Sequence, residues 1–265
     1  YKRQGVKLVR VLGNLTTKEF DPILMLDSFD SINPDDYTAG FPMHPHRGIE
    51  TISYVSRGKM VHRDSLGNEA GISDGEVQWM NSGSGIMHEE MVPAAERLLG
   101  VQLWLNLPAK DKMSKPSYNS IKNEDIKEIE IEGGKIRLLA GKYGEHEGYK
   151  GDYLSMDYYD IHLNADAEVT LTMEEDDSVM VFTLLGDVYI DGEHIEEKTA
   201  VKLTEGDSLT IKNGNEKAQV LYMNSRALNE PVAWAGPIVM NTQEELQKAF
   251  LELRSNTFIK ETAEY

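Results

Sequence analysis

The stretch FPMHPHRGIETISYVSRGKMVHRDSLGN, residues 41–68, contains the pattern that decides the fold. Two β-rich segments, Glu50 to Arg57 and Lys59 to Asp64, lie on either side of Gly58. Runs of β-branched and aromatic residues favour strands, and a glycine between two such runs is a turn signal. The stretch therefore predicts two short, successive strands.

Similar β-rich segments lie on both sides of this stretch, with turn signals about every 8 to 12 residues, a spacing typical of an all-β barrel or sandwich. The run LPAKDKMSKPSYNSI, residues 107–121, interrupts the pattern and predicts a linker. Strand-like segments resume at Ile126 and continue to Asn224. We therefore expect two tandem antiparallel β-barrels, in domains 1–120 and 121–265.

The end of the chain has a different pattern. Leu246, Phe250 and Leu253 recur at helical spacing after the polar run Asn241-Thr242-Gln243-Glu244-Glu245. Thr242 followed by Glu245 fits an N-terminal capping box, in which each residue satisfies a backbone amide of the other. The sequence therefore predicts one short C-terminal helix.

The composition excludes several function classes. The chain has 45 acidic and 27 basic side chains, a net charge of −18, and residues 151–215 hold 16 acidic against 3 basic ones. Such a charge repels nucleic acid phosphates and anionic membranes, so we expect no direct contact with either. There is no cysteine, which leaves His and carboxylate as the strong metal ligands. No transmembrane run or signal-peptide pattern is found, so we expect a cytoplasmic protein.

Two short motifs predict a metal site. They are His44-Pro45-His46 and His88-Glu89-Glu90. Because side chains alternate between the faces of a strand, His44 and His46 share a face, and so do His88 and Glu90. If both faces point into one barrel, three imidazoles and one carboxylate converge. This donor set suits Fe, Mn, Ni, Cu or Zn, with positions left open for substrate or oxygen.

Other polar residues near these motifs have alternative interpretations. Strand parity nominally places Glu50 with His44 and His46, but a bulge at Arg47-Gly48 would reverse its face, so Glu90 is the preferred carboxylate. Glu89 has the opposite parity and is expected to face away. His62, close to Asp64, is interpreted first as marking the end of a hairpin, with the alternative that it orients a ligand or substrate.

Three stretches carry a family resemblance, namely residues 41–68, GEVQWMNSGSGIMHEEM at 75–91 and GPIVMNTQEELQKAFLELRSNTF at 236–258. This resemblance is to the pirin family of the cupin superfamily. It implies a bicupin whose N-terminal barrel holds one metal ion, usually iron, through His44, His46, His88 and Glu90. The second domain has no His-x-His motif, and we expect it to lack a metal site.

The resemblance also implies a function. It points to a metal-dependent dioxygenase that cleaves a small aromatic substrate, a flavonol such as quercetin, with O2. In such an enzyme Glu90 is both a ligand and the candidate catalytic base. The alternatives are a non-catalytic, redox-responsive regulatory protein that binds a protein partner, such as a transcription cofactor or an enzyme modulator, and a cupin acting on another small metabolite. A monomer is expected.

Overall fold

Antiparallel strands make up most of the protein, as seen in a computed structural model that describes residues 2–3, 5–204 and 206–261. The chain folds into two compact units. The first comprises the described residues of Tyr1–Lys18, Ile23–Lys122 and Leu228–Tyr265, and the second comprises those of Glu19–Pro22 and Asn123–Ala227. The predicted all-β class is confirmed, with one C-terminal helix in the described part of the chain.

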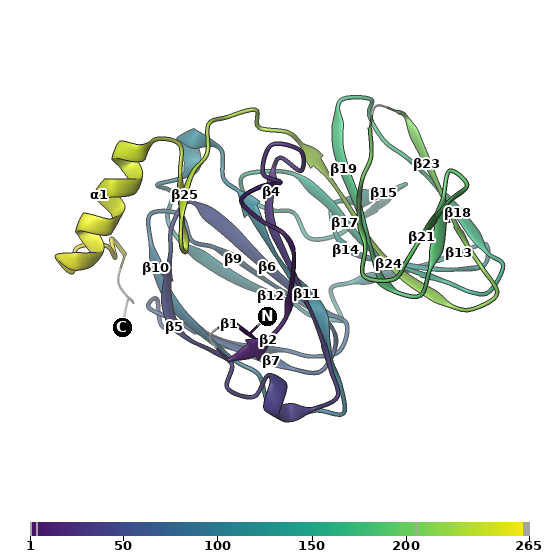
Figure 1. The fold of residues 1–265 in the computed structure, drawn as a ribbon, viewed down its shortest axis with the longest axis horizontal. Coiled ribbons are helices and arrows are strands. Elements are labelled where there is room, and N and C mark those ends of the chain that lie inside the picture. Colours follow the sequence, from purple (N-terminus) through teal and green to yellow (C-terminus); the bar gives the residue numbers. More distant parts are fainter. Residues whose placement is uncertain (1, 4, 205, 262–265) are drawn as a thin grey trace. The chain divides into compact units, whose positions relative to one another are not determined.

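The first unit contains a barrel built from two antiparallel sheets (Figure 1). The larger sheet has the order β12-β9-β6-β11-β4-β3, and its strands are β3 (Val9–Leu12), β4 (Ile23–Ser31), β6 (Ile49–Arg57), β9 (Glu76–Asn81), β11 (Leu98–Asn106) and β12 (Ser117–Ile121). The smaller sheet has the order β5-β10-β7-β8, and its strands are β5 (Phe41–His46), β7 (Met60–Asp64), β8 (Glu69–Ile72) and β10 (Ile86–Met91).

The second unit repeats this arrangement. Its larger sheet has the order β13-β14-β17-β24-β19-β22, with strands β13 (Lys127–Ile131), β14 (Gly134–Ala140), β17 (Met156–Leu163), β19 (Asp177–Leu185), β22 (Ala200–Lys202) and β24 (Ala218–Arg226). Its smaller sheet has the order β18-β23-β20-β21, with strands β18 (Glu168–Thr172), β20 (Val188–Ile190), β21 (Glu193–Ile195) and β23 (Ser208–Asn213).

The remaining elements are short, apart from the helix. They are the two-residue strands β1 (Lys2–Arg3), β2 (Val6–Lys7), β15 (Lys142–Tyr143) and β16 (His146–Glu147), the hairpin β25 (Ala233–Ala235) and β26 (Ile238–Met240), the 3-10 helices η1 (Pro34–Asp36) and η2 (Ala109–Asp111), and helix α1 (Gln243–Arg254). None of the helices in the described ranges is long and apolar enough to cross a membrane.

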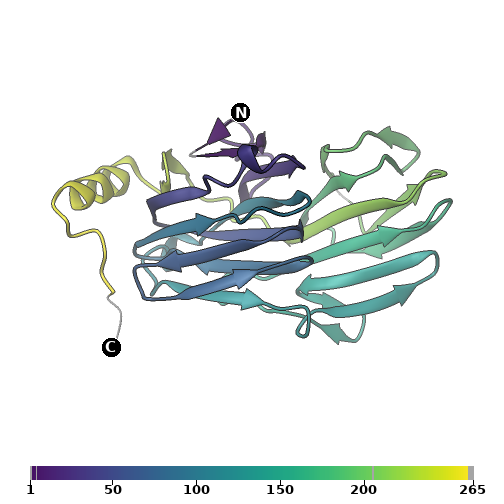
Figure 2. The same ribbon diagram turned by 90° about the horizontal axis from the view of Figure 1, so that it is seen from below.

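The strands follow the burial that their sequences dictate. In β18, Val169 and Leu171 are buried, whereas the alternate residues Glu168, Thr170 and Thr172 are exposed. This is the period-two pattern of a strand with one solvent-exposed face. Strand β11 lies inside its sheet between β4 and β6 and is buried throughout. At Gly100 in β11, an added Cβ would lie 2.2 Å from the carbonyl oxygen of Tyr54, so only glycine fits this pairing. Figure 2 shows the long strands of the first unit running side by side.

Helix α1 begins at the predicted capping box. The backbone N–H of Glu245 donates to Thr242 Oγ1 at 3.2 Å, and Glu245 Oε2 accepts from the backbone N–H of Thr242 at 3.0 Å. The helix buries Leu246 and Ala249 in a small apolar cluster that also contains residues of the β25–β26 hairpin (Figure 1). The predicted C-terminal helix is confirmed, and its packing fixes it to that hairpin.

The division into units differs from the expected domains 1–120 and 121–265. The C-terminal segment 228–261 groups with the first unit, because Val239 donates its N–H to Arg47 O at 3.1 Å and packs against Ile49 and Trp104. The expected linker at 107–121 also contains structure, because β12 pairs with β9 in the larger sheet of the first unit. Polar composition concealed this strand, since only Ile121 of β12 is buried.

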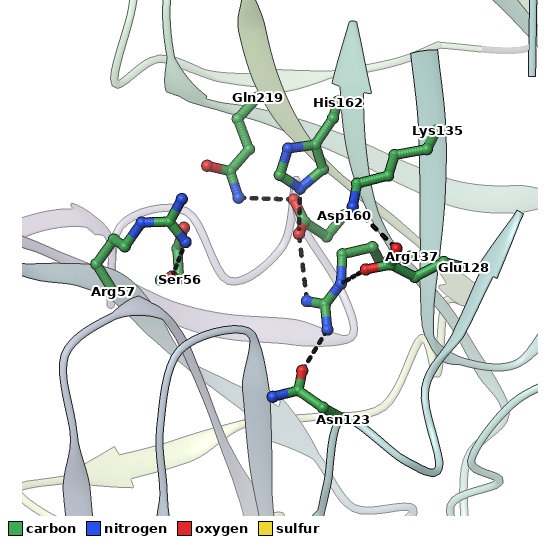
Figure 3. A network of polar contacts seen from close by, with 9 residues as sticks. All are labelled: Ser56, Arg57, Asn123, Glu128, Lys135, Arg137, Asp160, His162 and Gln219. Carbon is green, nitrogen blue, oxygen red and sulfur yellow. Dashed lines mark hydrogen bonds and ion pairs between the residues drawn. The ribbon is translucent and has the colours of Figure 1, made fainter. Parts of the chain in front are cut away.

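A polar network in the second unit surrounds the buried carboxylate of Asp160 on β17 (Figure 3). It accepts a hydrogen bond from Gln219 Nε2 at 2.8 Å, and its Oδ2 lies 2.7 Å from His162 Nε2 and 3.6 Å from Arg137 Nη1. Arg137 in turn donates to Glu128 and to Asn123. Burial of a carboxylate is costly unless it is paired, and these contacts satisfy Asp160 within its own unit.

Candidate metal centre

Strands β5 and β10 bring the predicted histidines together. They pair antiparallel, with His88 opposite His44 and Ile86 opposite His46. Because alternate residues share a face, the three imidazoles lie on the same side of this ribbon. His44, His46 and His88 each offer one ring nitrogen, and these atoms all lie within 4.8 Å of one another. The structure therefore brings about the expected convergence of three imidazoles, while metal binding itself stays a prediction.

Backbone carbonyls fix the rings of His44 and His46. Nδ1 of His44 lies 2.8 Å from Pro42 O, and Nδ1 of His46 lies 3.0 Å from Pro237 O. A carbonyl oxygen can only accept, so in each neutral ring Nδ1 carries the proton and Nε2 keeps the lone pair. These two Nε2 atoms lie 3.0 Å apart, and a cation bound between them would relieve the repulsion of their lone pairs.

His88 supplies the clearest sign of a missing partner. It is 1% exposed, and its Nε2 atom is buried without a hydrogen-bond partner. Burial and the neighbouring histidines lower the pKa of His88 well below 6.5, so the ring is neutral at neutral pH and retains a lone pair. An unsatisfied buried polar atom is costly, and a metal ligand bond is the interaction that suits a bare imidazole nitrogen.

The spacing of the donors fits a transition metal ion. A protein Zn–N bond is about 2.1 Å long, so two such nitrogens at right angles about an ion lie about 3.0 Å apart. The distance between His44 Nε2 and His46 Nε2 is 3.0 Å. This pair therefore has the spacing of neighbouring ligands on a divalent ion such as Fe, Mn, Ni, Cu or Zn, and a ring nitrogen of His88 lies within 4.8 Å of both residues' ligand atoms.

Glu90 lies on the same buried face of β10 but is held by amides. Its residue is 2% exposed, and Gln102 Nε2 lies 3.1 Å from each of its carboxylate oxygens, while Gln78 Nε2 donates to Oε1. Burial raises the pKa of Glu90, and the hydrogen bonds from the glutamines offset part of this rise. Among the described residues, the cluster of potential ligands comprises the three histidines without Glu90. The role of Glu90 as fourth ligand stays a prediction.

The other carboxylates lie where they do not join the cluster. Glu50 is on β6 in the larger sheet, and its Oε1 accepts from Trp79 Nε1 at 3.0 Å. The side chain of Glu89 is 31% exposed and lies 3.9 Å from Arg63 in an ion pair. Glu89 therefore faces away from the histidines, as its strand parity predicts.

His62 contacts the cluster from strand β7. Its Nδ1 lies 3.4 Å from Nδ1 of His88, its Nε2 lies 2.8 Å from Asp64 Oδ2, and its ring stacks on that of Tyr118 at 4.0 Å. Burial raises the pKa of Asp64, but hydrogen bonds from His62 and Asn68 outweigh that effect and hold it below its usual value. Of the two interpretations that the sequence leaves open for His62, these contacts favour ligand orientation over a hairpin end.

The sequence motifs assign no functional position to Gln78, Gln102 or Tyr118. A signal is available for the glutamines, because Gln78 and Gln102 each have apolar neighbours on both sides within a strand that is buried throughout. A polar side chain in such a strand needs an interior partner. For Tyr118 no signal exists, because its strand lies in the segment that the composition marks as a linker.

The strand that carries His44 and His46 is anchored to the C-terminal segment. The next residue, Arg47, is buried and donates to Ser84 O at 2.7 Å and to Phe258 O at 2.9 Å. Its guanidinium also forms a 2.8 Å ion pair with Glu252 of helix α1.

Lys112 is a second buried cation of the first unit. Its Nζ donates to Gly48 O at 2.8 Å and to Asn106 Oδ1 at 2.7 Å. Burial lowers the pKa of Lys112 to about 7.

Comparisons with known proteins agree with this architecture. The profile of the family Pirin matches residues 5–105, and that of the Pirin C-terminal cupin domain matches residues 158–259. A pirin-like protein of Caulobacter vibrioides is 37% identical over 96% of this chain and 93% of its own length, and pirin of Homo sapiens is 35% identical over 95% and 87%. The crystal structure of quercetin 2,3-dioxygenase from Acinetobacter baumannii superposes with a TM-score of 0.89 at 31% identity, covering 97% of this chain and 93% of that one. The chain therefore belongs to the pirin family.

Proposed function

We propose that this protein is a metal-dependent dioxygenase that cleaves a small aromatic substrate of the flavonol type with O2. One observation carries the proposal, namely the convergence of three imidazoles, of which His88 has a buried Nε2 without a hydrogen-bond partner. The similarity to a protein described as quercetin 2,3-dioxygenase supports the substrate class.

His44, His46 and His88 would hold the metal, with Glu90 as the proposed fourth ligand. A bound divalent ion, iron being the first choice and Mn, Ni, Cu or Zn the alternatives, would supply Lewis acidity toward the substrate hydroxylate and reactivity toward dioxygen. His46 and His88 are buried, whereas His44 is only partly buried. The side of the cluster next to His44 is therefore the proposed side of approach for a substrate.

Glu90 is the proposed base for the substrate hydroxyl. Its raised pKa, caused by burial, brings it closer to neutral pH than that of an ordinary glutamate, which favours proton acceptance. The amides of Gln78 and Gln102 hold the carboxylate in place. A Glu90→Gln variant that still binds metal should lose about 100-fold or more in turnover, the usual contribution of a general base. Full turnover by this variant would remove Glu90 from the role.

The function is tested by incubating the iron-loaded protein with quercetin in air. Ring cleavage should remove the flavonol absorbance and release carbon monoxide, and a His44→Ala, His88→Ala double variant should do neither. Turnover with other enediol or catecholic compounds measures how specific the site is. Stoichiometric metal binding without any turnover would refute the enzymatic proposal and favour the regulatory alternative.

A further inference from the structure

We propose that His62 and Asp64 are positioning residues that fix the tautomer of His88 and thereby aim its Nε2 lone pair at the metal. The inference rests on the metal centre proposed above and assigns to it a supporting shell that the motif residues alone do not reveal. The contacts that support it run from Asp64 inward to His88.

Asp64 is a fully satisfied acceptor. Its Oδ1 accepts from the backbone N–H groups of Leu66 at 2.9 Å and Asn68 at 3.1 Å. Its Oδ2 accepts from Asn68 Nδ2 at 2.8 Å and lies 2.8 Å from His62 Nε2. A carboxylate surrounded by donors is ionised and can only accept, so the proton in the last contact belongs to Nε2 of His62.

A proton on His62 Nε2 sets the partner that His88 meets. The proposed form of His62 carries its proton on Nε2 alone and has a lone pair at Nδ1, the atom that lies 3.4 Å from Nδ1 of His88. In this form His88 donates from Nδ1, which leaves its Nε2 with a lone pair. That Nε2 is the same buried atom that has no hydrogen-bond partner. The three residues are therefore joined in one chain of contacts that runs from Asp64 through His62 to His88.

The ring of His62 is held so that the chain of contacts cannot rearrange easily. The residue is fully buried, and its ring lies parallel to that of Tyr118, with an interplanar angle of 10° and centroids 4.0 Å apart. In the pairing of β10 with β7, Glu90 lies opposite His62 and His88 opposite Asp64. His62 and Asp64 are thus fixed by the sheet register, by ring stacking and by the Asp64 hydrogen bonds.

The barrel itself does not require this polar pair. In the second unit, β20 occupies the place of β7 in the smaller sheet, and its two inward-facing residues are Val188 and Ile190. Both are buried and apolar, so the fold forms without a His–Asp pair at these positions. The pair in the first unit therefore serves the site beside it. Its effect is to orient His88 and to increase the electron density at Nε2, which strengthens metal binding.

The first test uses the wild-type apoprotein and needs no variant. Nitrogen-15 NMR of histidine-labelled protein at pH 8 distinguishes protonated from bare ring nitrogens. We expect His88 to be protonated on Nδ1 and bare on Nε2, and His62 to be protonated on Nε2. A proton on Nε2 of His88 would overturn the proposal.

The second test measures Co(II) affinity by competition with a chromophoric chelator. Asp64→Asn and His62→Leu should each weaken binding by about 10- to 100-fold, the usual effect of losing such a partner. His62→Gln should retain most of the affinity, because an amide can donate to Asp64 and accept from His88. This rescue, together with a shift of the Co(II) absorption bands in Asp64→Asn, separates positioning from a general loss of stability.

His162→Leu in the second unit is the matched control, because His162 also contacts an aspartate two residues away, at 2.7 Å from Asp160. Its Co(II) affinity should equal that of the wild type. If the wild type binds Co(II) and both Asp64→Asn and His62→Leu bind equally well, the positioning role is refuted while the metal centre stands. If the wild type binds no Co(II), the metal centre is refuted and this inference with it. If Asp64→Asn does not fold, the His88 and His62 tautomers measured by NMR in the wild type decide whether the positioning role stands.

Discussion

The two barrels share their sheet order but differ in the side chains that their corresponding strands carry into the interior. Strands β5 and β10 of the first barrel occupy the same places as β18 and β23 of the second. The first two strands contain the cross-strand pairs His88–His44 and Ile86–His46, whereas the second two contain the buried apolar pairs Ile211–Val169 and Leu209–Leu171. The strands that carry the proposed ligands in one barrel therefore have counterparts that carry core residues in the other.

This difference shows which features belong to the fold and which to the site. The second barrel has a continuous apolar core, whose burial contributes to the stability of its strands. The first barrel instead buries His62, Gln78, His88, Glu90 and Gln102, although a buried polar group left unsatisfied costs about 1–3 kcal/mol. Such a polar interior weakens a core that could be apolar, which is expected where function requires it.

The largest contrast is expected in metal content. A His44→Ala, His88→Ala double variant removes two of three converging nitrogens and should lower bound metal from about one equivalent per chain, the content of a mononuclear site, to a trace. Elemental analysis of the untagged protein measures this. A His162→Ala, His194→Ala variant of the second unit should keep its metal. Retention of metal by the first variant would mean that the site lies elsewhere.

The apolar interior of the second barrel predicts the opposite behaviour. Ile161 on β17 is fully buried in that core, and Ile161→Ala should lower the free energy of unfolding by about 2–5 kcal/mol through lost burial and a cavity. Urea denaturation monitors the loss, and the metal content of the folded protein should not change. A fall in metal affinity would show that the core of the second barrel also supports the metal centre of the first.

Lys112 should give the first unit a pH-dependent stability. Its pKa of about 7 in the folded protein lies below the value near 10.4 of an unfolded lysine, so the unfolded chain binds more protons between these limits. The free energy of unfolding should therefore rise with pH from about 7 to 10, by about 2 kcal/mol once the hydrogen bonds that favour the charged amine are allowed for. Comparing urea denaturation of the wild type and Lys112→Met across this range isolates the effect. If the free energy of unfolding rises equally with pH in both proteins, Lys112 is not the source of the pH dependence.

The smallest expected effect concerns the helix that groups with the first unit. Thr242→Ala removes the side chain that caps α1 and should cost about 1 kcal/mol of stability. Thr172→Ala, at an exposed position of β18, is the matched control and should change stability by less than about 0.5 kcal/mol. Thermal unfolding of the two variants distinguishes them. Equal stabilities would show that the capping box does not contribute.

Several features were predictable from local sequence because local rules produce them. Alternation along a strand places His44 with His46 and His88 with Glu90, and the structure keeps both pairs on buried or partly buried faces. The capping box at Thr242 and the outward direction of Glu89 follow from equally local rules. Such rules act over one to four residues and need no knowledge of the fold.

The features that were missed depend on contacts between distant residues. Glu90 shares a face with His88, yet Gln78 and Gln102 on other strands determine where its carboxylate lies. The segment 228–261 was expected to belong to the second domain because it follows that domain in the chain, but Val239 packs with Ile49 and Trp104. The spacing of residues along the sequence predicts neither outcome, because the packing of distant strands brings the glutamines to Glu90 and the apolar side chains to Val239.

The hydrogen bond between His46 Nδ1 and Pro237 O joins positions 191 residues apart. During synthesis on the ribosome, all three imidazoles emerge long before this carbonyl and before the Phe258 carbonyl that binds Arg47. A nascent chain that has reached residue 122 thus carries the complete set of histidines while one ring still lacks its orienting acceptor. The His46 ring can therefore reach its final orientation only in the last part of translation, after the whole second barrel has been made.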